Sequence, residues 1–142
     1  MPEIIDLGQA PRPLFPDWKV KQHNGRGKLV WNPNNIDLYR PQANTIEDLL
    51  SETSKLDCLN DNVLVYLYRR PESISPTWKV DGATPINCLR IFFLGTVWGY
   101  IGGQPDSQFV RRLEFWGGQW RIGNQRMKDT VDINSVVATL KK

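Results

Sequence analysis

The segment Leu113–Met127, which reads LEFWGGQWRIGNQRM, restricts the fold more than any other part of this 142-residue chain. Two runs of aromatic and aliphatic residues meet at a Gly-Gly pair, a pattern typical of a β-hairpin with a two-residue turn. A turn at Gly117-Gly118 fixes how the two strands pair. The expected cross-strand pairs are Trp116–Gln119, Phe115–Trp120, Glu114–Arg121 and Leu113–Ile122.

This register sorts apolar residues onto one face of the hairpin and opposite charges onto the other. We therefore expect Phe115 and Trp120 to belong to the core, and not to an aromatic surface that stacks on a ligand. Trp116 and Arg112 fall on the opposite, outer face. A longer turn would shift the register by one residue and exchange the two faces.

The apolar run Leu89–Trp98 predicts a further strand before the hairpin. Both of its faces are apolar, as in a central strand that is covered on both sides or covered at one end by helices. The three strands, at about 89–98, 108–116 and 119–126, form an antiparallel β-meander. The expected fold class is α+β: a single domain with this meander, an N-terminal hairpin, and two or three short helices packed on the sheet.

The N-terminal part predicts an arm and a hairpin. Residues 1–17 are rich in proline, which fixes φ and removes amide donors, so we expect an extended arm followed by a single globular α+β domain at 18–142. The short β-prone runs Trp18–Gln22 and Lys28–Trp31 flank the polar segment His23–Gly27. They predict the N-terminal hairpin, with a basic tip.

Three segments have helical patterns. Asn44 or Thr45 is placed to cap a helix that runs to about residue 56, with acidic residues in its first turn. The segment Asn62–Arg70 has strand-like residues, but an acid precedes it and a proline follows it; both structures remain open, and the helix is favoured. The segment Asp132–Leu140 has an apolar stripe at helical spacing and predicts a short helix.

Charge is distributed unevenly along the chain. The net charge is +3 with a pI near 9.0, but residues 18–40 carry +4, residues 44–62 carry −4 and residues 107–128 carry +4. Such a distribution can steer polyanions or acidic proteins toward the surface. It also arises when solvated faces pair with one another in the fold, and this explanation is favoured.

The two cysteines, Cys58 and Cys88, have no CxxC-like spacing, so we expect free, buried thiols. The first residues lack the basic and apolar segments of a signal peptide. The longest nearly uncharged apolar segment, Ile91–Ile101, is shorter than a membrane span. These features predict a cytoplasmic protein that does not associate with a membrane.

No residue pattern indicates catalysis, a metal or a cofactor. His23 is the only histidine, and its place in a basic loop is a poor one for an oriented base, with Cys58, Cys88 or a serine as its partner. The run Gly25-Arg-Gly-Lys28 lacks the glycine and hydroxyl residue that a Walker A loop needs, and the acidic residues have no EF-hand spacing. We expect a non-enzymatic protein without a cofactor.

Several short runs lie between residues 62 and 120: Asn62-Val-Leu-Val-Tyr-Leu, Pro71-Glu72, Pro76-Thr-Trp78-Lys79, Phe92-Phe-Leu-Gly95-Thr96 and Val110-Arg-Arg-Leu-Glu-Phe-Trp-Gly-Gly-Gln-Trp120. With these runs the chain resembles, over about half its length, a family of short uncharacterised bacterial proteins with an F-x-G-T strand and a C-terminal W-x-G-x-W hairpin. Leu94 stands where the family pattern has tryptophan, and residues 80–89 are an insertion relative to it. The shared motifs are structural, and the resemblance implies no activity.

Two functions of different classes fit these features. The first is a protein-protein interaction or accessory module, because tryptophan and arginine are enriched at interface hot spots. The second is single-stranded nucleic-acid binding, with tryptophans stacking on bases and basic residues contacting phosphates. The candidate interaction surface consists of Arg112, Trp116, Trp98, Arg121, Lys19, Lys21, Arg26 and Lys28.

The modest net charge favours the protein partner over nucleic acid. In the predicted register Arg111 and Arg126 also fall on the core side, which reduces the basic residues that could contact phosphates. An enzyme with an unrecognised site is the third interpretation. The partner's identity, and the choice between monomer and homodimer, are left open by the sequence.

Overall fold

The computed structural model describes residues 4–79 and 87–141, so residues 1–3 of the expected arm and most of the insertion at 80–89 lie outside the described part. The fold is α+β in a single domain, as predicted. Its elements are β1 (Ile4–Asp6), β2 (Trp18–His23), β3 (Lys28–Val30), β4 (Ile36–Tyr39), α1 (Ile46–Glu52), α2 (Asp61–Arg69), β5 (Arg90–Tyr100), β6 (Phe109–Trp116), β7 (Gln119–Arg126) and β8 (Ser135–Leu140).

The main sheet is built around β5, the longest strand. The order of its strands is β4-β8-β5-β6-β7, and β2 also pairs with β5. On one side of β5 lies β6, antiparallel to it; on the other side β8 runs parallel to residues 90–92 and β2 runs antiparallel to residues 96–100. Residues 91–99 are all buried, which confirms a central strand covered on both faces.

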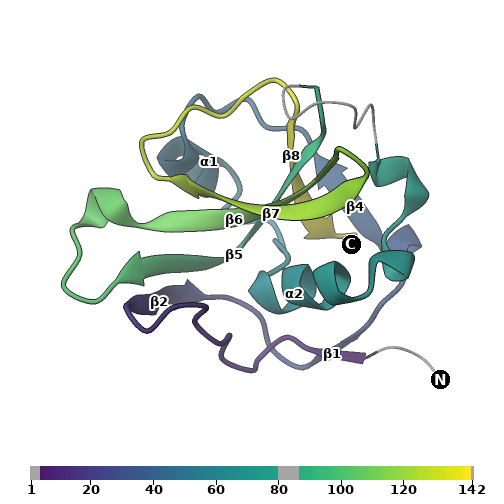
Figure 1. Cartoon of the computed structure of the whole chain (residues 1–142), viewed down its shortest axis with the longest axis horizontal. Helices are drawn as coiled ribbons and strands as arrows, with labels where there is room; N and C mark the ends of the chain where they lie inside the picture. Colours follow the sequence, from purple (N-terminus) through teal and green to yellow (C-terminus); the bar gives the residue numbers. More distant parts are fainter. Residues whose placement is uncertain (1–3, 80–86, 142) are drawn as a thin grey trace.

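The hairpin of β6 and β7 has the predicted register. All four expected pairs are present, from Trp116–Gln119 to Leu113–Ile122. Gly117 and Gly118 have φ values of 62° and 78°, in the left-handed region that glycine adopts without a steric penalty. The meander of β5, β6 and β7 is therefore confirmed (Figure 1).

An N-terminal pair of strands is present, but with a different partner from the one expected. β3 pairs with β1 and not with β2, and β2 pairs with β5 of the main sheet. This pairing brings the Trp18 ring to 5.5 Å from that of Trp98 and to 4.8 Å from that of Phe109. Burial of a large aromatic ring in this cluster stabilises the arrangement more than a two-stranded hairpin on the surface could.

The helix predicted at Asp132–Leu140 is wrong, because residues 135–140 form the strand β8. Ser135 to Thr139 are all buried, with Val136 in one core cluster and Val137 in another, so both sides of this segment are covered. A helix with one apolar stripe would leave its other side in solvent. Ile133, which the helix would have buried, is 90% exposed.

The two other predicted helices are confirmed. Thr45 caps α1 by accepting a hydrogen bond from the Asp48 amide at 3.2 Å, and α1 ends at Glu52, earlier than expected. The segment left open between strand and helix is α2, and Asn60 caps it, so Asp61 is its first helical residue and not its cap. Within the described residues no helix is long and apolar enough to cross a membrane.

The two helices cover opposite faces of the sheet (Figure 1). The larger core cluster lies between α2 and the face of β5 that carries Ile91 and Phe93, and β1 and β3 close its edge. A second cluster contains Ile46 and Leu49 of α1 and lies on the other face, against Phe92. The sheet is thus the middle one of three layers, between α1 and α2.

Candidate functional site

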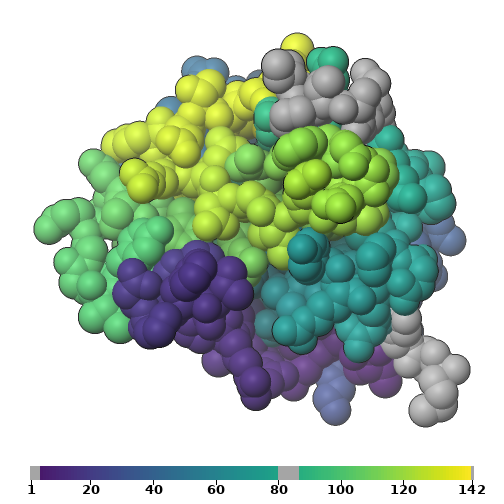
Figure 2. Space-filling model, in the orientation of Figure 1, coloured from purple at the N-terminus to yellow at the C-terminus, as the bar shows by residue number. Residues whose placement is uncertain are grey.

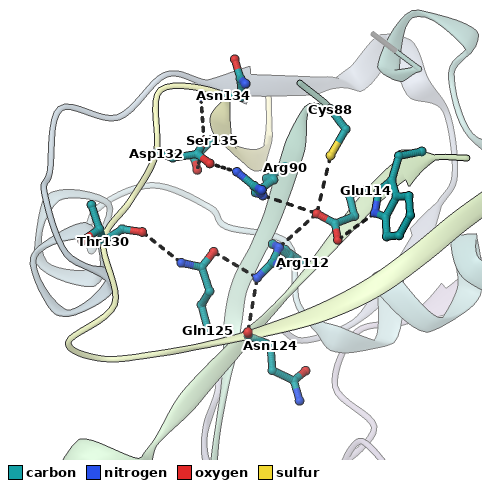
Figure 3. A network of polar contacts seen from close by, with 11 residues as sticks. Cys88, Arg90, Arg112, Glu114, Asn124, Gln125, Thr130, Asp132, Asn134 and Ser135 are labelled. Carbon is teal, nitrogen blue, oxygen red and sulfur yellow. Dashed lines mark hydrogen bonds and ion pairs between the residues drawn. The ribbon is translucent and has the colours of Figure 1, made fainter. Parts of the chain in front are cut away.

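The outer face of the β6–β7 hairpin carries a polar network centred on Glu114 (Figure 3). The Glu114 side chain is 9% exposed, and its carboxylate lies 3.5 Å from Arg90 Nε and 3.3 Å from Arg112 Nε. Trp116 Nε1 donates to the same carboxylate at 3.3 Å, and the Cys88 thiol lies 3.7 Å from it. The predicted neighbour Arg121 is opposite Glu114 in the register, but the ion pairs are made with the other two arginines.

Arg112 is a brace between the two strands, although the sequence suggested an exposed arginine. Its side chain is only 16% exposed. Besides Glu114, its guanidinium contacts the Asn124 carbonyl at 3.3 Å and Gln125 Oε1 at 3.1 Å. The guanidinium reaches these acceptors by lying across Gly123, where a Cβ would stand 2.8 Å from Arg112 Cζ. A side chain at 123 would therefore displace the Arg112 guanidinium from this position.

Arg121 and Trp116 form the solvent-facing part of the same surface. The Arg121 guanidinium carbon lies 3.8 Å from the centre of the Trp116 ring, and Arg121 Nε donates to the Trp116 carbonyl at 3.3 Å. Both side chains are half-buried. Within residues 4–79 and 87–141, Arg121 has no carboxylate at ion-pair distance.

Trp98, which the sequence suggested as a second stacking residue, is fully buried. It lies in the aromatic cluster with Trp18 and Phe109. The register between β5 and β6 shifts between Phe93 and Trp98, and this shift places the Trp98 side chain on the α2 side of the sheet. Because its ring has no exposed surface, Trp98 cannot stack on a nucleic-acid base.

The four basic residues of the N-terminal region are exposed, but they do not belong to one hairpin. Lys19 and Lys21 belong to β2, Lys28 belongs to β3, and Arg26 lies in the segment between them. Since β2 and β3 are in different sheets, the expected basic tip is not formed.

Charged residues of the acidic and basic stretches pair across the fold. The buried Asp61 carboxylate lies 2.9 Å from Arg111 Nη1, and at the surface Lys128 Nζ lies 2.9 Å from Glu47. Burial raises the pKa of Asp61, and the Arg111 guanidinium acts in the opposite direction. These pairs join residues 44–62 to residues 107–128, as the favoured explanation of the charge distribution requires. The core-side position predicted for Arg111 is confirmed by its burial.

A cleft of about 890 Å³ lies between the segments 22–26 and 50–60, and sequence inspection did not suggest it. It lies near Gly95, whose carbonyl accepts from the Asn24 amide at 2.6 Å and whose amide donates to the Leu59 carbonyl at 2.9 Å. These contacts satisfy the backbone amide and carbonyl of Gly95, which lies between the part of β5 paired with β8 and the part paired with β2.

His23 and Cys58 both line this cleft. His23 Nε2 lies 2.9 Å from the Leu7 carbonyl, so it donates there, and Nδ1 lies 2.9 Å from Thr96 Oγ1. The Cys58 thiol donates to the Thr53 carbonyl, and burial raises its pKa. Neither cysteine forms a disulfide; Cys88 is buried as expected and Cys58 is half-buried. The ring of His23 is thus anchored by the fold, and the thiol is held in its less reactive, protonated form.

Among the described residues no group of three or more His, Cys, Asp or Glu side chains is arranged to hold a metal ion. The outer face of the hairpin brings together three of the eight predicted site residues, Arg112, Trp116 and Arg121. No protein-family model, curated protein or solved structure matches this chain.

Proposed function

We propose that this protein is a non-enzymatic protein-interaction module that binds an acidic partner through the outer face of the β6–β7 hairpin. The observation that carries the proposal is the stacking of Arg121 on Trp116, with 3.8 Å between the guanidinium carbon and the ring centre. The stack holds an arginine without a carboxylate partner in the described part of the chain next to a half-buried tryptophan. Tryptophan and arginine are the residue types that most often dominate interface energies.

The stack prepares Arg121 for binding. Ordering a long side chain at an interface costs about 0.5–1.5 kcal/mol, and a side chain that is already held in place avoids part of this cost. The contact with the ring contributes about 0.5–1 kcal/mol at an exposed site. The hydrogen bond from Arg121 Nε to the Trp116 carbonyl fixes one edge of the guanidinium. A fork of N–H donors on such a group suits a carboxylate.

The charges around the stack indicate the character of the partner. Strand β7 contains Arg121 and Arg126 and no acidic residue. The acid on the facing strand, Glu114, is buried between Arg90 and Arg112 and so does not neutralise Arg121. An acidic partner would supply the missing negative charge and would be attracted before contact.

Nucleic acid is a weaker candidate for the same surface. Trp98 is buried, and one face of Trp116 is covered by Arg121, so little of either ring is available to stack on bases. The exposed lysines of β2 and β3 are divided between two sheets. The burial of Trp98 and the cover on Trp116 leave little aromatic surface for base stacking.

Photo-crosslinking tests the proposal. A photoreactive amino acid in place of exposed Gln119, beside the stack, should capture an acidic protein from a lysate of the source organism. The same group in place of exposed Lys55 serves as the matched control position. Capture at 119 should be lost with Arg121→Gln and kept with Lys55→Gln. Equal capture at both positions, or capture of nucleic acid at 119, would overturn the proposal.

A further inference from the structure

We infer that the acidic partner binds as an additional strand along the free edge of β7, and that its segment alternates apolar and acidic residues. The inference rests on the proposed function, because it specifies how the partner of the hairpin surface is recognised. The edge of β7 is the side that faces away from β6, its neighbour in the sheet order. Strand addition at such an edge is a common way to bind an extended segment, since the backbone itself supplies donors and acceptors.

The register shows which backbone groups of β7 point away from β6. Trp116 and Gln119 flank a two-residue turn and exchange hydrogen bonds, so odd-numbered residues of β7 bond to β6 and even-numbered residues point outward. Two contacts agree with this alternation. The Asn124 carbonyl accepts from Arg112 Nη1, and the Arg126 amide donates to Asp129 Oδ2 at 2.9 Å.

Between the turn and these two contacts, the outward groups are available. The amides of Trp120, Ile122 and Asn124, and the carbonyls of Trp120 and Ile122, have no partner within the described ranges of the chain. The atoms of β7 lie at the front of the molecule in Figure 2, in yellow-green, with α2 in teal beside them and no other segment in front. A strand of four or five residues would match the length of this edge.

The two faces of β7 demand different side chains from the added strand. Trp120 and Ile122 are partly buried against the larger core cluster on the α2 side, so a neighbouring residue on that side would be apolar. Arg121 is on the outer face, so the residue beside it there would be acidic. Because successive side chains of a strand point to opposite faces, the partner alternates between the two kinds.

A second copy of this chain does not meet these demands. Pairing β7 with β7 would place no acidic residue beside Arg121, because neither strand contains one, and each strand adds the positive charge of Arg126. Like charges on neighbouring strands destabilise the pairing. The charge on the edge therefore selects an acidic segment of another protein over self-association.

The first test uses fluorescently labelled peptides of alternating valine and glutamate, with blocked ends. Two control peptides are needed: alternating valine and lysine, and a block peptide with all valines before all glutamates. The alternating Val-Glu peptide should bind about tenfold tighter than both controls, and Arg121→Gln should remove most of this preference. A Val-Glu peptide that binds no better than the Val-Lys peptide would overturn the inference.

The second test separates strand addition from simple charge attraction. On binding, amide exchange measured by NMR should slow at Trp120, Ile122 and Asn124, and should not change at Arg121 and Gly123, which already bond to β6. Asn124→Pro removes one outward amide at an exposed position and should weaken binding about fivefold, whereas Asn124→Thr keeps the amide and should not. The exchange pattern is measured on the unaltered protein, so it decides the question even if the proline variant does not fold.

The outcomes distinguish the two proposals. If Arg121→Gln abolishes peptide binding but the exchange pattern is absent and Asn124→Pro has no effect, strand addition is overturned while the hairpin surface still binds acidic partners. If photo-crosslinking at residue 119 fails its control, the proposed function is overturned irrespective of the peptides.

Discussion

The guanidinium of Arg112 lies across Gly123 on the neighbouring strand, so close that a Cβ at 123 would stand 2.8 Å from Arg112 Cζ and 3.1 Å from its Nε. Arg112 and Gly123 are paired in the register of β6 and β7. The bare backbone of the glycine lets the arginine cross the strand and reach the Asn124 carbonyl. The Arg112 side chain thus links β6 to β7 on the outer face of the hairpin, and it can do so because Gly123 has no side chain.

Gly123→Ala should therefore destabilise the fold, because its methyl group displaces the Arg112 guanidinium. Inserting a methyl group into a packed site costs about 1–3 kcal/mol, and the lower entropy of the unfolded alanine chain offsets about 0.4–1 kcal/mol. We expect a net loss of about 1–2 kcal/mol in urea unfolding. In an Arg112→Ala background the same change should be neutral or stabilising. An equal loss in both backgrounds would show that the arginine does not cause it.

Replacement by alanine should lower the unfolding free energy strongly at Trp98 and only weakly at Trp116. Trp98 is fully buried, so Trp98→Ala should cost about 3–5 kcal/mol of unfolding free energy. Trp116 is half-buried and supports Arg121, so Trp116→Ala should cost under about 1 kcal/mol but should reduce binding of the alternating Val-Glu peptide. Thermal unfolding and fluorescence anisotropy measure the two effects. A large loss of stability with Trp116→Ala would assign the ring to the core instead of the interaction surface.

The protein should lose more stability when one residue of the buried pair Asp61–Arg111 is replaced than when both are replaced. The two side chains are 2% and 8% exposed and 2.9 Å apart. Asp61→Leu alone would leave a buried guanidinium without its ion pair, at a cost of about 3–5 kcal/mol. The double variant with Arg111→Met should recover part of this loss. A double variant that is less stable than either single variant would contradict the pairing as the source of the effect.

Glu52 should make stability depend on pH in the acidic range. Its carboxylate accepts from Tyr39 Oη at 2.5 Å and from the Gln42 and Ala43 amides, and the hydrogen bond from Tyr39 lowers its pKa below the usual 4.5. A carboxyl with a lowered pKa in the folded state contributes stability above pH 4.5 and loses it as pH falls through the folded pKa.

The comparison with Glu52→Gln measures this contribution. The difference in unfolding free energy between the unaltered protein and the variant should be constant above pH 4.5 and should shrink at more acidic pH. Glu72→Gln, at an exposed glutamate, controls for the loss of one charge. A difference that grew on acidification would contradict the lowered pKa of Glu52.

The sequence was most informative where a feature is local. A Gly-Gly turn with alternating residues on both sides defines the pairing of β6 and β7, because the two strands are adjacent in the chain. Likewise, the caps and the apolar spacing identify α1 and α2. In these cases the interactions that decide the structure lie within a few residues of one another.

Non-local interactions explain the errors. The apolar positions of residues 133–140 fit a helical stripe, and only the presence of β4 and β5 on either side makes a strand buried on both faces the better structure. Trp18 pairs with β5, and Glu114 pairs with Arg90 of β5, through contacts that short sequence windows do not contain. The outer position of Arg112 was deduced correctly, but its role as a brace depends on Gly123 of the next strand.

The place of β8 between β4 and β5 has a consequence for the order of folding. Ile36 of β4 pairs with Leu140 of β8, so the chain must close a loop of about a hundred residues before that side of the sheet exists. Such long closures slow folding, whereas an isolated β-hairpin forms in about 1–10 μs. We therefore expect the hairpin of β6 and β7, with its open edge, to take shape before the strands that complete the sheet behind it. During that interval the two arginines of β7, a strand without an acidic residue, disfavour edge-to-edge pairing between newly made copies of this chain.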